Sequence, residues 1–254
     1  EKKKDYSLGR MVELLDPSPD RQTPVCIAGC CQWQHIRYEK QVEYKEAIIR
    51  ESLQRLGRME WSSPIKRVTG PDRNYRMRAS FHVVAGRLGF MQEKSHVVVP
   101  IKECASLVPE LNEFIGSIDP GNAREVHAIS TPEVAYSIVL PNGTIQRSGL
   151  ATIHVDGIQY RVRPETFFQA NRFLLGPFIQ EVIEQAGPSP VHILELYSGV
   201  GFFSIPLSRT ATELIGVEGN SATVRQGQEN ARLNERWNLR LFEGPVDATL
   251  RGAD

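Results

Sequence analysis

The residues most able to do chemistry lie in the last third of the chain. Glu195-Leu-Tyr-Ser-Gly-Val-Gly-Phe202 places two glycines directly after an apolar run, and Glu218 ends the next apolar run. Gly199 and Gly201 permit positive φ, so a ligand can lie against bare backbone where a helix begins. A carboxylate at the end of the neighbouring strand can accept hydrogen bonds from two ribose hydroxyls. This pattern predicts a nucleoside-containing cofactor, with Glu218 on its ribose.

S-adenosylmethionine fits the pattern better than a dinucleotide. The dinucleotide fingerprint G-x-G-x-x-G is incomplete, because Ser204 occupies the position of the third glycine. The acidic Glu195 suits a cationic methionine moiety better than a diphosphate. Two alternatives remain: an ordinary strand–turn–helix connection without ligand, and a nicotinamide dehydrogenase, which the broken fingerprint disfavours.

The cysteines form a second candidate site. Three of the four lie within six residues, and no apolar export signal follows the basic start Lys2-Lys-Lys4. In a reducing compartment, clustered thiols more often hold metal or do redox chemistry than form disulfides. We therefore expect a cytoplasmic protein whose thiols are candidate metal ligands: Cys26, Cys30, Cys31 and Cys104.

The overall charge balance, 30 Lys+Arg against 30 Asp+Glu, does not indicate any class of binding partner. No apolar run approaches the roughly 18 residues of a membrane span. Local charge is more informative. Arg55–Arg78 carries seven basic residues against two acids, with Trp61 and Tyr75 among them. Basic residues beside aromatic rings can neutralise phosphates and stack on bases, although a solvated basic face is an equal alternative. The predicted RNA contacts are Arg73, Tyr75, Arg76 and Arg78.

Three kinds of segment must position these residues. Residues 1–18 contain a strand over Met11–Leu15, and a helix over Tyr38–Leu56 should stop at Gly57. Short β-like runs and one short helix, Pro109–Ile118, fill the chain up to about Leu150. Strands and helices then alternate, which implies a parallel sheet with right-handed crossovers. The strands expected there are one after Gly157 and those over Val191–Leu196, Glu213–Val217 and Leu239–Phe242. The expected helices are one through Gln185, one through Ser208, and one that begins at a Ser221 cap and runs to about Asn234.

The motifs, in this order, resemble the TRAM-domain-containing RNA (uracil-C5) methyltransferases of ribosomal and transfer RNA. The resemblance runs nearly end to end, and several ordered motifs together are more specific than any one. Pro164-Glu-Thr-Phe-Phe-Gln-Ala-Asn171 is the most family-specific string. The other matching strings are Asp5–Arg21 (end of the TRAM barrel), Cys31-Gln-Trp-Gln-His35 (end of the cysteine box), Tyr75-Arg-Met-Arg78 and Val98–Cys104 (central insert), and Glu195–Gly201 (cofactor motif).

The resemblance implies an α/β fold, α+β overall, with a β-rich central insert before an incomplete Rossmann-like class I methyltransferase domain. It divides the chain into the end of a TRAM barrel (1–18), a cysteine box and helix (19–58), a central RNA-contacting domain (59–150) and the first part of the methyltransferase domain (151–254).

Carried over residue by residue, the resemblance implies that Gln169 lies at the junction of cofactor and substrate and that Tyr197 packs on the cofactor. The remaining cofactor-binding residues are Gly199, Gly201, Phe202 and Glu218. Phe202 departs from the family, which often has Asn there, and a polar residue usual near Pro245 is missing. For Gln169 and Asn171 the alternative is a capping or turn role at a helix start.

The resemblance also implies a [4Fe–4S] cluster held by the four cysteines. Cys31 and Cys104 match the third and fourth ligand positions, whereas Ala28 stands where the second ligand is expected. Adjacent Cys30 and Cys31 oppose a cluster, because neighbouring side chains in extended backbone point apart. The alternative is a set of buried thiols that hold no metal.

The implied function is methylation of uridine C5 in ribosomal or transfer RNA. In this family a cysteine thiolate adds to C6, C5 takes the methyl group, and a base removes the C5 proton. That cysteine and the base glutamate are expected beyond Asp254, so no catalytic residue is assigned here and we expect a fragment truncated at both ends. The alternative is a non-catalytic RNA-binding or iron–sulfur module. No membrane partner is predicted, and the expected state is a monomer.

Overall fold

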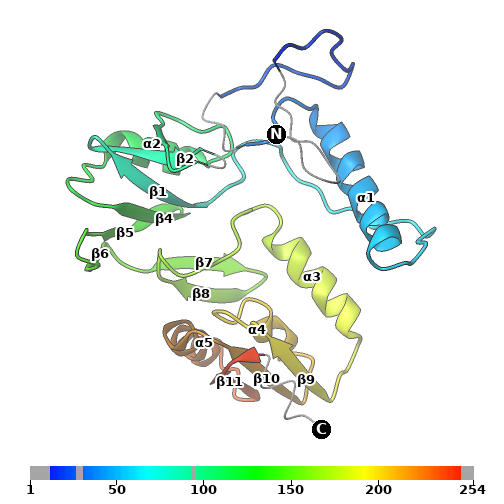
Figure 1. Cartoon of the computed structure of the whole chain (residues 1–254). Coiled ribbons are helices and arrows are strands. Elements are labelled where there is room, and N and C mark those ends of the chain that lie inside the picture. Colours follow the sequence, from blue (N-terminus) through cyan, green and yellow to red (C-terminus); the bar gives the residue numbers. More distant parts are fainter. Residues whose placement is uncertain (1–11, 27–30, 93–94, 247–254) are drawn as a thin grey trace. The chain divides into compact units, whose positions relative to one another are not determined.

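Figure 1 shows a computed structural model of the chain, which describes residues 12–26, 31–92 and 95–246. The chain forms two compact units, residues 1–66 and 67–254. Within the described ranges, no helix is both long enough and apolar enough to cross a membrane.

The first unit is built around helix α1, Tyr38–Arg55. The helix ends where predicted: the N–H of Leu56 bonds to the Ser52 carbonyl at 2.9 Å, with Gly57 next. Asp20 anchors its first turns, accepting from the Arg37 guanidinium at 3.0 Å and from the Tyr44 hydroxyl at 2.8 Å. The helix prediction is confirmed.

The predicted strand over Met11–Leu15 is wrong for Val12–Leu15, which has no strand structure, and Met11 lies outside the described residues. A strand needs a neighbouring chain for its ladder of hydrogen bonds. In the described part of this unit, the one bridge joins Arg21 to Ile36.

The second unit begins with a six-stranded antiparallel sheet in the order β3-β2-β1-β4-β5-β6. In β1, Ala79 and Phe81 are buried and Ser80 is exposed, as expected where alternate side chains face the core. Helix α2, Pro109–Ser117, contacts β4 and β5 and buries Leu111 and Phe114, so the short-helix prediction is confirmed. The strands are β1 Arg78–Val84, β2 Arg87–Met91, β3 Val98–Pro100, β4 Glu125–Thr131, β5 Glu133–Val139 and β6 Ile145–Arg147.

A hairpin of β7, Ala151–Val155, and β8, Ile158–Val162, lies between this sheet and the layer below it in Figure 1. Its turn residues Asp156 and Gly157 have φ of 50° and 71°, the left-handed pair that a tight two-residue hairpin requires. Strand β7 was not predicted, although the Asp-Gly pair between two apolar runs is a sequence signal for such a hairpin.

The layer below is a parallel sheet in the order β11-β10-β9, which confirms the predicted α/β character. Asn220 caps α5 by accepting from the N–H of Thr223 at 3.0 Å. The predicted cap at Ser221 is therefore wrong, because Ser221 is already the first helical residue. The elements are α3 Leu175–Ala186, β9 His192–Leu196, α4 Ser204–Leu207, β10 Glu213–Glu218, α5 Ser221–Leu233 and β11 Leu239–Glu243.

Two asparagines join α5 to the hairpin. The fully buried amide of Asn230 accepts from the N–H of Arg161 at 2.8 Å and donates to the carbonyls of Arg161 (3.2 Å) and Val200 (3.1 Å). Asn234 bonds to the N–H and the carbonyl of Gln159 in the same way, at 3.0 and 2.7 Å. Side chains of a helix thus take the place of a third strand along the edge of β8.

We expect Asn230→Ala to lower the free energy of unfolding by about 2–4 kcal/mol, because it leaves the buried Val200 carbonyl and the partly buried N–H and C=O groups of Arg161 without partners. Urea denaturation measures the loss. Glu229→Ala, at an exposed position on the same helix, is the control and should change stability by less than about 0.5 kcal/mol. Equal midpoints for the two variants would contradict the role assigned to Asn230.

Candidate cofactor site

The turn after β9 is held in an unusual backbone conformation. Tyr197, Gly199 and Gly201 have φ of 61°, 56° and 86°. The N–H of Ser198 bonds to the Val217 carbonyl of β10 at 3.1 Å, so the turn is tied to the neighbouring strand. A left-handed residue with a side chain costs about 1–2 kcal/mol, and such outliers concentrate at functional sites. The ring of Tyr197 is 71% exposed, as a ring that packs on a ligand would be.

The glycines leave open space on one side and close packing on the other. A Cβ added to Gly199 would meet no atom within 4 Å. A Cβ added to Gly227 of α5 would lie 2.7 Å from Leu241 and 3.2 Å from the Gly199 carbonyl oxygen. Helix α5 therefore supports the turn from behind, while a ligand can approach the backbone of Gly199.

Glu218 meets the glycine turn at the end of β10. Its Oε2 accepts from the N–H of Gly199 at 3.1 Å, and its Oε1 accepts from the N–H of Asn220 at 2.9 Å. A carboxylate offers about four acceptor positions, so two remain for other donors. The carboxylate can hold a pair of ribose hydroxyls without giving up either backbone contact.

Glu195 is a second acid of a different kind. Burial raises its pKa to about 7, an effect partly offset by the Ser204 hydroxyl, which donates to Oε2 at 2.5 Å. The serine that breaks the dinucleotide fingerprint thus supports this carboxyl group. A cation placed beside Glu195 would favour its ionised form.

The family-specific segment Pro164–Asn171 is brought beside the glycine turn. Its backbone is hydrogen-bonded to the residue that precedes β1: the N–H of Met77 donates to the Ala170 carbonyl at 2.8 Å. The Phe168 ring meets the edge of Phe202, with ring centroids 5.2 Å apart. Gln169, the next residue, is half-buried, and its side-chain amide makes no hydrogen bond to any described residue. It is available to a ligand.

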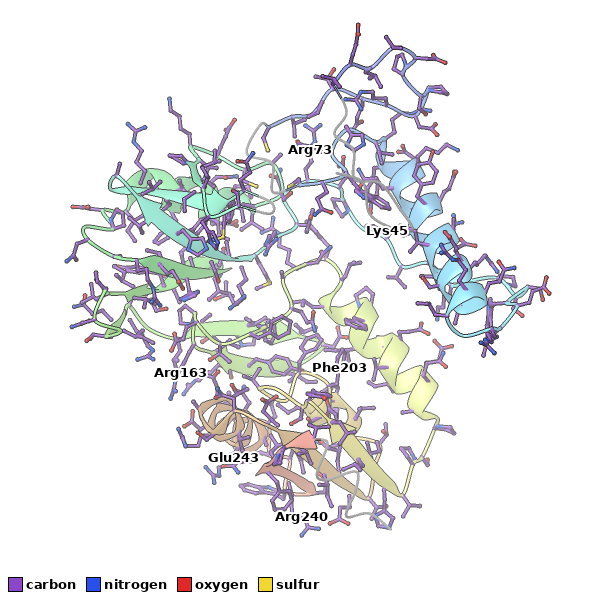
Figure 2. All side chains as sticks on the ribbon, in the orientation of Figure 1. Lys45, Arg73, Arg163, Phe203, Arg240 and Glu243 are labelled. Atoms are coloured by element: carbon purple, nitrogen blue, oxygen red, sulfur yellow. The ribbon has the colours of Figure 1, made fainter. Side chains whose placement is uncertain are left out.

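The side chains of Asn171 and Phe202 both make contacts within the protein. The Asn171 Oδ1 accepts from the N–H of Phe173 at 3.1 Å, which is the turn role given above as the alternative. Phe202 is 6% exposed, and its carbonyl accepts from the buried Tyr160 hydroxyl at 2.9 Å. Its ring packs with Tyr160, Phe168 and Phe203, the last of which is labelled in Figure 2. The Phe202 side chain therefore belongs to the core.

The predicted RNA residues separate into two kinds. Arg78 is half-buried, its Nε donates to the Thr166 carbonyl at 3.2 Å, and burial lowers its pKa. This places Arg78 as a brace for the Pro164–Asn171 segment. Arg73 and Arg76 are exposed, with Tyr75 half-buried between them.

The cysteines fall in both units. Cys26 and Cys31 belong to the first unit and the buried Cys104 to the second, while Cys30 lies outside the described residues. Over the ranges described, no three His, Cys, Asp or Glu side chains gather as metal ligands.

Comparison with known proteins accords with this geometry. The profile of the tRNA (uracil-5-)-methyltransferase family matches residues 137–243. An uncharacterized RNA methyltransferase from Aquifex aeolicus is 30% identical over 95% of this chain and 67% of its own length. The chain belongs to the RNA (uracil-C5) methyltransferase family.

Other relatives carry more specific names. A 23S rRNA (uracil(1939)-C(5))-methyltransferase RlmD from Alkalilimnicola ehrlichii is 27% identical over 100% of this chain and 69% of its own length. The structure of a Pyrococcus abyssi tRNA (uracil-54, C5)-methyltransferase, in complex with S-adenosyl-L-homocysteine, superposes with a TM-score of 0.68. It is 22% identical and covers 92% of this chain and 68% of its own, so it supports the fold of this family member. The chain spans about two thirds of the length of these relatives.

The asparagines that join α5 to the hairpin, and the partner of Glu195, were not predicted from the sequence. Asn230 and Asn234 are one helical turn apart, and a pair of amides at that spacing on a helix face that packs inward was an available signal. Ser204 served only as evidence against a dinucleotide, and its hydrogen bond to Glu195 was not foreseen.

The raised pKa of Glu195 predicts a pH dependence of stability. Between about pH 4.5 and pH 7 the folded protein binds more protons than the unfolded chain, so stability should fall as the pH rises through this window and level off above it. The expected decrease in the free energy of unfolding across this window is roughly 2–4 kcal/mol. Glu195→Gln should remove this part of the profile in urea denaturation at a series of pH values. Glu243→Gln, an exposed acid on β11, is the control; identical profiles for parent and Glu195→Gln would disprove the assignment.

Proposed function

We propose that this chain provides the cofactor and RNA-binding parts of an S-adenosylmethionine-dependent methylation of uridine C5 in ribosomal or transfer RNA. The observation that carries the proposal is the meeting of the Glu218 carboxylate with the N–H of Gly199, at 3.1 Å, next to open space above the glycine. S-adenosylmethionine, when bound, supplies an electrophilic methyl group. The family membership and the names of the relatives support this reaction class.

Each residue of the site has a distinct role in this proposal. Glu218 binds the ribose hydroxyls, and Gly199 and Gly201 present bare backbone to the cofactor. The exposed ring of Tyr197 packs on it. Glu195 faces the methionine ammonium group, whose charge would lower the pKa of Glu195 and ionise it.

In this proposal Gln169 contacts the target base. It follows Phe168, whose contact with Phe202 brings the segment to the cofactor turn. Its amide can donate to a uracil carbonyl and accept from the uracil N3–H. The base must leave its stack to reach this position, as in other enzymes that modify a base. We assign the attacking thiolate and the base to no described residue.

The exposed side chains of Arg73 and Arg76 are proposed to bind RNA phosphates, with Tyr75 available for stacking. Arg78, which braces Thr166, would act on RNA only through the position of the neighbouring segment. Ribosomal or transfer RNA, and with it a cytoplasmic location, is proposed from the relatives' substrates, 23S rRNA uracil 1939 and tRNA uracil-54.

Glu218→Ala should weaken S-adenosylmethionine binding by about 1–3 kcal/mol, the range for lost charge-assisted hydrogen bonds. Titration calorimetry measures the affinity. Because Glu218 also holds two backbone N–H groups, urea denaturation must show that the variant is folded, and Glu218→Gln should lose less affinity. Glu243→Ala, on the neighbouring strand, should bind as the parent does. Unchanged affinity in folded Glu218→Ala would refute the ribose role.

A [4Fe–4S] cluster is a separate proposal. Two cysteine backbones are clamped by amides: Gln34 bonds to the N–H and carbonyl of Cys26 at 3.1 and 2.7 Å, and Asn112 to those of Cys104 at 2.8 and 3.1 Å. The Gln34 amide also donates to the Cys26 sulfur at 3.7 Å.

Anaerobic purification should yield brown protein with about four irons and four sulfides per chain. Cys104→Ser should lose most of both. A colourless, iron-free parent protein would favour the alternative of thiols that hold no metal.

A further inference from the structure

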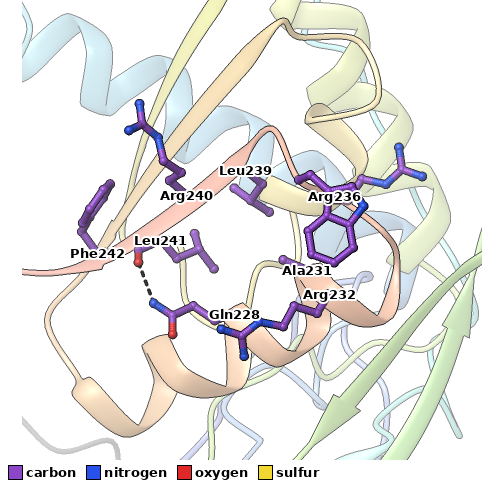
Figure 3. A pocket seen from close by; sticks show the side chains of 9 residues that line it. Gln228, Ala231, Arg232, Arg236, Leu239, Arg240, Leu241 and Phe242 are labelled. Carbon is purple, nitrogen blue, oxygen red and sulfur yellow. Dashed lines mark hydrogen bonds between the residues drawn. The ribbon is translucent and has the colours of Figure 1, made fainter.

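A groove lies at the outer edge of the parallel sheet, between β11 and α5 (Figure 3). Its lining residues are Gln228, Ala231, Arg232, Arg236, Trp237, Leu239, Arg240, Leu241 and Phe242, which we call the Trp237 groove. None of them belongs to the glycine turn, to Glu218 or to the Pro164–Asn171 segment. The groove is therefore separate from the cofactor site.

The lining is cationic. Three of its nine residues are arginines and none is acidic; the exposed acids at nearby positions, Glu229, Glu235 and Glu243, do not line it. Arg240 pairs with Glu213 of β10. The guanidinium of Arg232, by contrast, has no hydrogen bond or ion pair to another described residue. The Arg232 guanidinium is therefore available to a ligand.

Trp237 is 76% exposed, unusual for the largest apolar side chain. The backbone on both sides of it is anchored. The N–H of Arg236 bonds to the Ala231 carbonyl at 2.9 Å, and the Asn238 amide donates to the carbonyls of Ser208 and Ala211 at 2.8 and 2.9 Å. The ring is thus presented to solvent from a fixed loop, which lowers the entropic cost of binding against it.

The side chain of Arg236 is also held in position, because its Nε donates to the Asn234 carbonyl at 2.7 Å. An exposed aromatic ring beside two available guanidinium groups matches a nucleotide: the base stacks on the ring and the phosphate pairs with the cations.

The edge of β11 disfavours the other plausible occupant, a strand from a second copy of the chain. Strand addition needs unpaired backbone groups along the edge. Here the Gln228 amide donates to the Leu241 carbonyl at 2.9 Å, drawn as the dashed line in Figure 3, and so occupies an acceptor such a strand would use. Arginines at the same edge would also repel the like charges of a second copy.

We propose that the Trp237 groove binds one nucleotide of a single-stranded segment of the RNA substrate, with the base on Trp237 and the phosphate on Arg232 and Arg236. That the bound nucleotide belongs to the RNA substrate rests on the proposed function. The groove itself and the chemistry of its lining are independent of that function. The groove would give the RNA a second attachment point outside the cofactor site.

The test uses a single-stranded RNA of about 12 nucleotides, within the span of such sites. Trp33→Phe/Trp61→Phe leaves Trp237 as the single tryptophan of the three in the chain, and RNA should quench its fluorescence. Trp237→Leu should lower RNA affinity about 5- to 150-fold, whereas Trp237→Tyr should retain most of it. Arg232→Gln should reduce the slope of log K against log [salt] by about 0.7. Arg225→Gln, an exposed arginine of α5 outside the groove, is its matched control.

The outcomes separate the two proposals. If the parent binds RNA and the Trp237 and Arg232 variants bind it equally well with the same salt slope, the groove proposal fails and the proposed function stands. If the parent binds no RNA at low salt, both fail. If Trp237→Leu converts a dimer to a monomer in sedimentation without changing RNA affinity, the groove is an interface between copies and the proposal is overturned. Unchanged S-adenosylmethionine affinity in Trp237→Leu shows that the variant is folded.

Discussion

The three hydrogen bonds of the buried Asn230 amide hold together the parts of the molecule that make up the site. One of them supports the carbonyl of Val200, inside the glycine turn, and the other two satisfy both backbone groups of Arg161 on β8. Without them, the buried Val200 carbonyl and the two partly buried backbone groups of Arg161 would lie beside a helix with no partner, at a cost that grows in low dielectric. The close approach of α5 that makes these bonds possible depends on Gly227, where any side chain would meet Leu241 and the turn itself.

A cluster of aromatic rings adds the second connection. Tyr160 of β8, Phe168 of the family-specific segment and Phe202 of the glycine turn come from three places in the chain, and their ring centroids lie 5.2 to 5.8 Å apart. The Tyr160 hydroxyl satisfies the Phe202 carbonyl, so the cluster has no unpaired polar atom at that point. Gln169 follows Phe168 directly, and this packing is what places its unpaired amide near the turn. The position of a proposed substrate-contacting residue thus depends on apolar contacts.

The two acids of the site illustrate how environment separates groups of the same chemical type. Glu218 accepts from two backbone N–H groups, an arrangement that suits a carboxylate and leaves acceptor capacity for hydroxyl donors. Glu195 is half-buried with one hydroxyl donor, and its pKa rises to about 7. Glu195 is therefore poised to ionise when a cation arrives. A sulfonium cofactor with a ribose and an ammonium group has a use for both.

The sequence by itself determined the local features: the helix that stops before Gly57, the glycine turn with Glu218 one strand later, the alternation of strands and helices after Gly157, and the ordered motifs of the family. These depend on propensity, periodicity and backbone freedom, which act over a few residues. The sequence-based prediction was wrong where an element needs a neighbouring strand, since Val12–Leu15 has strand-like residues but no described strand beside it. Tertiary structure alone decided that Arg78 braces the Thr166 segment, that Phe202 turns into the core, that Asn230 stands in for a strand, and that Trp237 borders a cationic groove. Each of these depends on which distant backbone group or ring lies within a few ångströms, and no local pattern encodes that distance.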